Sequence, residues 1–196
     1  MSTRERILAA AEACLRRDGI RRTTVQGVAD EAGLSRAYLY RFFPDKAGLV
    51  SAVLIHRDQA FWDDAGHRIS SAADEAGVAG MVAEAVLIAR GSALPPLGLH
   101  LFETEPVEYA RVMGRFATEV VPGLAGYWED WLADGVRRGL IRPGLDLAAT
   151  AEWVLRQVIS LVVLPGTAVD VDDRESLRRY LGPFLEPALG TRALRG

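Results

Sequence analysis

Apolar side chains recur along most of the chain at spacings of three and four residues, which place them on one face of an α-helix. In the first such segment, Arg4–Arg17, the apolar positions are 7, 8, 11, 14 and 15, and Gly19 follows as a helix stop. The same spacing predicts helices over about 25–32, 35–42, 45–67, 75–90, 97–104, 106–118, 119–139, 146–164 and 173–188. No run alternates apolar and polar residues between hairpin turns, so we expect an all-α fold.

Two short helices near the N-terminus are joined by a tight turn. Thr24 is placed to cap the first, Val25–Ala32, and Ser35 to cap the second, which runs to about Phe42. Gly33 permits a positive φ in the connection, whose length suits helices that cross at a steep angle. Asp45 is the expected cap of the longer helix that follows. The pattern predicts a helix-turn-helix.

The second short helix exposes side chains that suit a nucleic acid. Leu39 and Phe42 are expected to face the core, with Tyr40 and Phe43 at the flanks. The residues left outside are Ser35, Arg36, Tyr38 and Arg41. An α-helix fits the DNA major groove, where arginine donates two hydrogen bonds to guanine. Similar helix pairs also occur in α-proteins that never meet DNA, so the motif alone does not decide the function.

Charge is distributed unevenly along the chain. The net charge of the 196 residues is −3, but residues 1–50 hold nine basic groups against six acidic ones, and the remainder fourteen against twenty. A basic N-terminal part on an acidic body fits a protein that offers one end to phosphates. An offset of this size also arises by chance, so it supports DNA binding without establishing it.

Residues 23–49 resemble the tetracycline-repressor-like (TetR) family of bacterial regulators. The matching strings are TTVQGVADEAG, LSRAYLYRFF and PDKAGLVSAV. The resemblance implies a three-helix DNA-binding head over residues 1–60 and a helical ligand-binding and dimerisation body over 61–196. It also implies a regulator, by default a repressor, that binds double-stranded, palindromic operator DNA as a homodimer. The implied DNA contacts are Thr24 and Gln26 at backbone or groove edge, Ser35, Arg36, Ala37 and Tyr38 at bases, and Tyr40 and Lys46 at phosphates, with Arg41 beside them.

The last two predicted helices are the expected dimer interface. The helix over 146–164 is apolar nearly all round its final turns, and the helix over 173–188 carries Leu177, Leu181, Phe184, Leu185 and Leu189 on one face. The resemblance implies a four-helix bundle of two chains. Burial of the same residues within one chain is the alternative.

Members of the family commonly hold a small ligand in the helical body, and its binding moves the heads apart. The expected effector here is apolar or aromatic, because the candidate lining residues are mostly large and apolar. These candidates are Phe102, Met113, Phe116, Trp128, Trp131, Trp153, Arg156 and Gln157. The aromatic residues could equally fill an ordinary core, and Arg156 could pair with Glu152, four positions earlier.

Several classes of function find no support in the sequence. It has no GxGxxG, phosphate loop, GxSxG or HExxH, so we expect no enzyme activity and no cofactor. The three histidines form no cluster with carboxylates, so we expect no metal site, and Glu103 and Glu105 are expected to be solvated. Cys14 lies on the apolar face of its helix and is expected in the core. No apolar run reaches the roughly 18 residues of a membrane span, and we expect a soluble, cytoplasmic protein. A ligand-sensing module whose head lacks DNA affinity is the alternative function.

Overall fold

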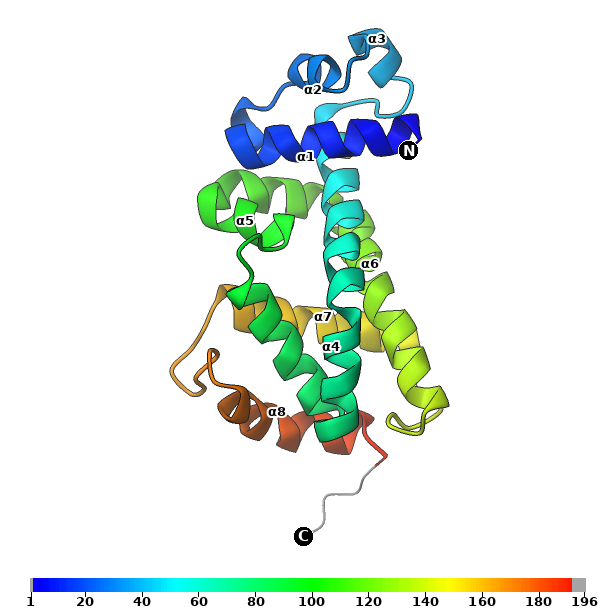
Figure 1. The fold of residues 1–196 in the computed structure, drawn as a ribbon, viewed down its shortest axis with the longest axis vertical. Helices are drawn as coiled ribbons and strands as arrows, with labels where there is room; N and C mark the ends of the chain where they lie inside the picture. Colours follow the sequence, from blue (N-terminus) through cyan, green and yellow to red (C-terminus); the bar gives the residue numbers. More distant parts are fainter. Residues whose placement is uncertain (1, 192–196) are drawn as a thin grey trace. The chain divides into compact units, whose positions relative to one another are not determined.

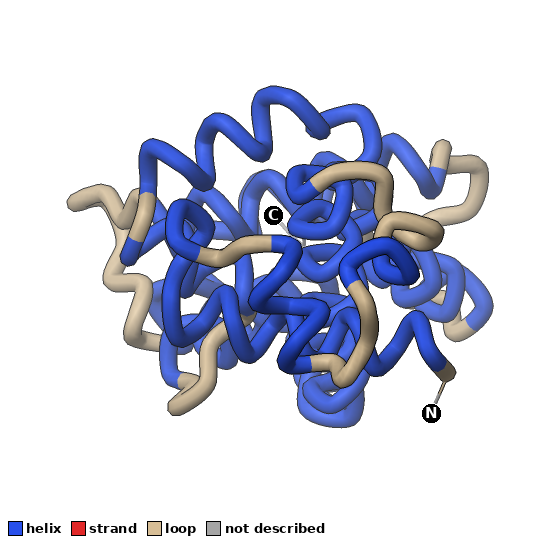
Figure 2. The backbone as a smooth tube through the Cα atoms, turned by 90° about the horizontal axis from the view of Figure 1, so that it is seen from above, coloured by secondary structure: helices blue, strands red, loops and turns tan. Residues whose placement is uncertain are grey.

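A computed structural model describes residues 2–191, and within that range the backbone consists of helices and their connections, without strands (Figure 2). The all-α prediction is confirmed. The helices, labelled in Figure 1, are α1 (Thr3–Arg22), α2 (Val25–Glu31), α3 (Arg36–Leu39), α4 (Lys46–Gly91), α5 (Leu97–Thr104), α6 (Pro106–Arg137), α7 (Leu147–Val163) and α8 (Arg174–Leu189).

Three helices run past the ends predicted for them. α1 continues beyond Gly19, although the φ of +75° at that glycine interrupts its helical geometry. α4 covers two predicted helices, with non-helical dihedrals at Ala76 and Gly77, and α6 covers two more, with a kink at Phe116. The segments between the predicted pairs contain no proline or glycine pair that would stop a helix, so the chain bends there rather than breaking.

The chain divides into two compact units. The head unit comprises the residues up to Ala60 together with Pro96–Gly123, and the body unit comprises Phe61–Pro95 and the residues from Leu124 onward. The predicted division at residue 60 matches the end of the first segment, but α5 and the first part of α6 also pack with the head. The functional roles assigned to the two parts stay predictions.

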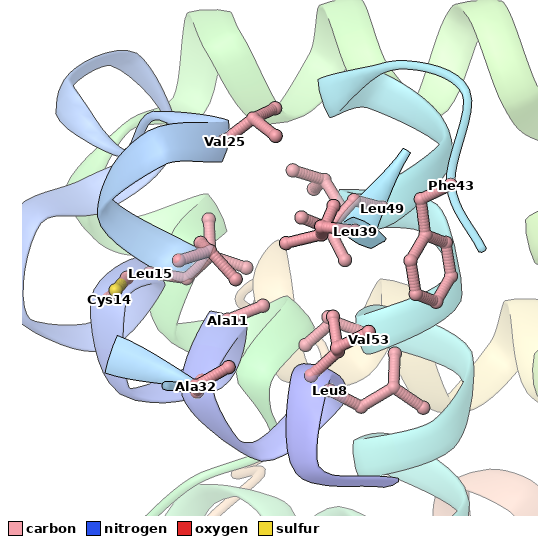
Figure 3. Close-up of a cluster of buried hydrophobic side chains, with 14 of the residues drawn as sticks. Leu8, Ala11, Cys14, Leu15, Val25, Ala32, Leu39, Phe43, Leu49 and Val53 are labelled. Carbon is pink, nitrogen blue, oxygen red and sulfur yellow. The ribbon is translucent and has the colours of Figure 1, made fainter. Parts of the chain in front are cut away.

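The core of the head unit is built from the apolar face of α1. Ile7, Leu8, Ala11, Cys14 and Leu15 are all buried, as the helical spacing predicts. Figure 3 shows side chains of α2, α3 and α4 meeting them in one cluster, and Leu97 and Leu101 of α5 belong to it as well. Because burying an apolar side chain contributes about 1.5–3 kcal/mol, this cluster fixes the short helices α2 and α3, which could not persist alone.

The body unit has its own buried side chains. α7 buries Ala151, Val154, Leu155, Val158 and Val162, and α8 buries Leu177, Leu181, Leu185 and Leu189. The buried carboxylate of Glu84 in α4 forms ion pairs with Arg68 and Arg174, so its charge is compensated. Among the helices of residues 2–191, none combines the length and apolarity needed to cross a membrane.

Candidate DNA-binding surface

The helix-turn-helix forms as the sequence predicts. The Thr24 hydroxyl accepts a hydrogen bond from the Gly27 amide at 3.0 Å, and the Ser35 hydroxyl accepts one from the Tyr38 amide at 3.2 Å. Both predicted caps are therefore confirmed, each typically contributing about 1 kcal/mol. Gly33 has a φ of +64°, which lets the chain turn between α2 and α3, and the next amide bonds back to Ala29.

One predicted orientation in this motif is wrong. Phe42 was expected in the core and Phe43 at the flank, but Phe43 is buried and Phe42 is exposed. The helical hydrogen bonds of α3 end after Leu39, and the amides of both phenylalanines then bond to the Leu39 carbonyl. Phe43, four residues beyond the buried Leu39, takes the inward position, and Phe42 is left on the surface.

Arg36 and Tyr40 form a pair on one side of α3. A guanidinium nitrogen of Arg36 donates to the Tyr40 hydroxyl at 3.0 Å, and the guanidinium carbon lies 5.4 Å from the ring centroid. Both residues are exposed. The pair holds the guanidinium in a defined direction at the surface, which reduces the entropy lost when it binds a partner.

Tyr38, Arg41 and Phe42 form a second group on the other side. The Tyr38 and Phe42 rings meet edge to face with centroids 5.5 Å apart, and the Arg41 guanidinium lies 5.5 Å from the Tyr38 ring. Ala37 is exposed between the two groups. On α2, exposed Gln26 donates to Asp30 at 2.7 Å, and exposed Thr24 caps the helix.

Lys46 lies at the start of α4, where its ammonium donates to the Arg21 carbonyl at 3.2 Å. Burial lowers the pKa of Lys46, an effect that the nearby charges of Glu105 and Glu108 partly offset. The predicted phosphate contact of this lysine therefore begins from a side chain already bonded to the end of α1.

Glu105, which follows α5, differs from its expected solvated state. Its carboxylate accepts a hydrogen bond from the Arg21 amide at 3.0 Å. This contact fixes the backbone just before α2 and was missed from the sequence, because the two residues lie 84 positions apart and leave no local pattern.

The candidate ligand residues do not form one group. Phe102, Met113 and Phe116 lie in the head unit, where Phe102 meets Tyr109 edge to face. Trp128 and Trp131 lie in the body unit, together with Trp62 and Tyr127, which the sequence reading did not select.

The three candidates on α7 do not lie on its buried face. Trp153 is 42% exposed, Arg156 is exposed and bonded to Glu152 at 2.6 Å, and Gln157 is half-buried. The Arg156–Glu152 pair was the alternative that the sequence left open, and it occurs at the surface.

Two buried donors in the aromatic group lack partners. The Tyr127 hydroxyl and the Trp128 indole nitrogen are both buried without a hydrogen bond. Burial also raises the pKa of Tyr127, with the charge of Asp63 adding to the effect, so the phenol stays protonated and able to donate. Among residues 2–191, no three His, Cys, Asp or Glu side chains group in a way that could hold a metal ion.

The geometry of residues 24–43 defines a helix-turn-helix protein that regulates transcription, and comparison with known proteins agrees. Residues 7–53 match the family model described as bacterial regulatory proteins, tetR family, so the chain is a TetR-family transcriptional regulator. An uncharacterized HTH-type transcriptional regulator of Mycobacterium tuberculosis is 26% identical, with 94% of this chain and 86% of that protein covered.

Solved structures with the same fold extend the likeness over the whole chain. The TetR family repressor AlkX from Dietzia sp. is 23% identical with a TM-score of 0.67, covering 95% of this chain and 96% of its own. Salmonella enterica GusR is 21% identical with a TM-score of 0.58, covering 94% and 95%. FadR from Bacillus subtilis, solved with stearoyl-CoA, is 16% identical with a TM-score of 0.50, covering 90% and 96%.

Proposed function

We propose that the protein is a repressor that binds a palindromic operator as a homodimer and releases it when a small ligand binds. The observation that carries the proposal is the exposed surface of α3, where Arg36, Tyr38, Tyr40 and Arg41 all point away from the buried Leu39. Such a surface is costly against water alone, whereas in a major groove its donors and rings meet base edges and phosphates.

The individual DNA contacts follow from where the side chains start. Arg36 and Tyr38 would read bases, assisted by Ser35 and Ala37 at the same end of α3. The phosphate contacts would come from residues at the edges of this surface, namely Thr24, Gln26, Tyr40, Arg41 and Lys46. Lys46 would have to exchange its bond to the Arg21 carbonyl for a phosphate oxygen.

A salt series with operator DNA tests this part of the proposal. The fragment would be the region upstream of the protein's own gene, and binding would be measured by mobility shift. The logarithm of affinity should fall linearly with that of salt concentration, with a slope of about −0.9 per phosphate contacted. Absent or salt-insensitive binding would favour the alternative of a ligand-sensing module without DNA affinity.

The homodimer is supported by apolar side chains that the chain itself leaves uncovered. On α7, just beyond it and on α8, these are Trp153, Ile159, Leu164, Tyr180 and Phe184. Phe184 is 65% exposed and contacts Tyr180, while the leucines of α8 fill the interior. Both expectations from the sequence therefore hold in part, since each helix buries one face within the chain and offers another. A second copy would cover the offered face and set two heads about 34–36 Å apart.

Phe184→Glu tests the dimer directly. A charge at the centre of this face should convert the dimer to a monomer in sedimentation velocity and weaken operator binding. Arg179→Glu is the matched control, because Arg179 is an exposed, charged residue of the same helix. A Phe184→Glu protein that sediments like the native one would place the interface elsewhere.

Ligand response is supported by the unpartnered donors of Tyr127 and Trp128. A buried donor without a partner costs about 1–3 kcal/mol, and a ligand with an acceptor atom would remove that cost. The surrounding rings of Trp62 and Trp131 suit an apolar or aromatic ligand. The charge of Asp63 acts on Tyr127, which favours a neutral acceptor such as a carbonyl over a carboxylate.

A defined panel tests the ligand proposal. Neutral aromatic carbonyl compounds and fatty acyl thioesters would be screened for a rise in melting temperature and for release of bound operator. Trp128→Phe removes the indole donor and keeps an aromatic ring, so it should weaken the active compound without abolishing operator binding. Retention of full ligand affinity in this variant would exclude the indole as the anchor.

A further inference from the structure

The exposed surface of α3 has two chemically different sides. In a helix each residue turns by about 100°, so with Leu39 pointing inward, Tyr38 and Tyr40 lie on opposite sides. Arg36 falls on the side of Tyr40, four positions away, and Phe42 on the side of Tyr38. The observed contacts agree, because Arg36 bonds to Tyr40 and Phe42 packs on Tyr38.

The side of Tyr40 is polar at its tip. The hydroxyl of Tyr40 accepts the hydrogen bond from Arg36, and the remaining donors of that guanidinium are available to acceptors on a base or phosphate. Recognition on this side therefore proceeds through hydrogen bonds.

The side of Tyr38 makes its contacts through rings. Arg41 lies over the face of the Tyr38 ring at 5.5 Å, and Phe42 meets it at 5.5 Å with an interplanar angle of 75°. The two aromatic residues are each 37% exposed, and Phe42 has no polar side-chain atom at all. Ring contacts from two neighbours hold Tyr38 in one orientation while leaving an apolar edge at the surface.

We propose that the Tyr38 ring, positioned by Phe42, reads the 5-methyl group of one thymine in each operator half-site. The thymine methyl is the one apolar group that the four base pairs present in the major groove. An exposed, braced ring gains from covering it, whereas a hydrogen-bond readout would leave the rings of Tyr38 and Phe42 without purpose. The inference rests on the proposed operator binding and adds the base type that this side of α3 selects.

The magnitude follows from the size of the group. Covering one methyl group strengthens binding about fourfold, and a dimer on two half-sites gains about fifteenfold. The effect is therefore measurable one position at a time.

Deoxyuridine substitution tests the proposal without changing any hydrogen-bonding group. Each thymine of the operator is replaced in turn by deoxyuridine, and affinity for the full-length protein is measured by fluorescence anisotropy. One thymine per half-site should respond with about fourfold weaker binding. The same thymine should respond in Tyr38→Phe, since the ring remains, and in Tyr40→Phe, the matched control from the other side.

The response should vanish in Tyr38→Ala and shrink in Phe42→Ala. Melting temperatures of the variants confirm that each folds. If operator binding is sequence-specific but no thymine responds, or if the response survives in Tyr38→Ala, the ring readout is wrong and the proposed function stands. Loss of the response in Tyr38→Phe would assign the readout to the hydroxyl instead. If the native protein binds no operator specifically, the proposed function fails and this inference with it.

Discussion

The backbone amide of Arg21 donates a hydrogen bond to the carboxylate of Glu105, with the nitrogen and Oε2 3.0 Å apart. The contact joins the end of α1 to the residue between α5 and α6, inside the head unit. The carbonyl of Arg21 in turn accepts the ammonium of Lys46. Both polar groups of one peptide residue just before the helix-turn-helix are thus held by charged side chains.

Replacing Glu105 should loosen the start of the helix-turn-helix. A hydrogen bond to a charged acceptor contributes about 1.5–3 kcal/mol when buried, and less at this partly exposed site, so Glu105→Ala should lower the free energy of unfolding by about 1 kcal/mol. Glu105→Gln keeps an acceptor oxygen and should lose less. Urea denaturation measures both. Equal losses would mean that the carboxylate acts through its general charge rather than through the bond to Arg21.

Gly19 should resist substitution because of the same carboxylate. Its φ is +75°, and a Cβ atom there would lie 2.6 Å from the carboxyl carbon of Glu105. Gly19→Ala should therefore cost more than the roughly 1–2 kcal/mol of the left-handed conformation alone. Gly33→Ala is the matched control, since Gly33 has a φ of +64° and no atom within 4 Å of such a Cβ.

The excess cost at Gly19 should shrink when Glu105 is absent. Measuring Gly19→Ala in the native and Glu105→Ala backgrounds isolates the clash from the backbone term. The same cost in both backgrounds, or in the Gly33→Ala control, would attribute everything to φ.

Buried Asp58 should make the head unit less stable as pH rises. Burial raises the pKa of Asp58 to about 7, although its hydrogen bonds from the Gly98 and Leu97 amides act in the opposite direction. The folded state therefore holds a proton that the unfolded state releases near pH 4. Stability contributed by this proton is complete below about pH 4 and is lost as pH rises to about 7.

Asp58→Asn should remove that pH dependence. The amide keeps an oxygen for the Gly98 N–H and carries no charge to desolvate, so the variant should gain up to about 4 kcal/mol relative to the native chain at pH 8 and little at pH 4. Equilibrium unfolding at both pH values provides the comparison. A native protein with the same pH slope as Asp58→Asn would show that the carboxyl is not protonated in the fold.

The sequence was sufficient for the elements whose causes are local. The caps at Thr24 and Ser35 and the turn at Gly33 depend on residues within four positions of one another, and all three occur as predicted. Phe42 and Phe43 were exchanged because periodicity was carried past the point where α3 ends, and one residue of error reverses which ring is buried.

Contacts between distant segments gave no such signal. The partner of Glu105 lies in α1, and the rings of Trp62 and Tyr127 meet although they lie on different helices. Apolar composition around residues 102–157 correctly indicated packing, but it could not tell that Trp153 faces outward while Trp128 is buried. The face of a helix that is apolar nearly all round is decided by its neighbours, which the sequence does not list.

Arg36 and Lys46 should fail in different ways when they are removed. Arg36 is held at the surface by Tyr40, so Arg36→Ala should relax the base preference at one position of each half-site. Lys46 has no base to read, so Lys46→Ala should weaken binding to all sequences alike and reduce the salt slope by about one. Because Lys46 also bonds to the Arg21 carbonyl, Lys46→Arg serves as the control that keeps the charge while changing the side chain. Selection from a randomised operator pool, followed by salt titration, measures both effects. Uniform losses from both alanine variants would remove Arg36 from the readout and leave it as a phosphate contact.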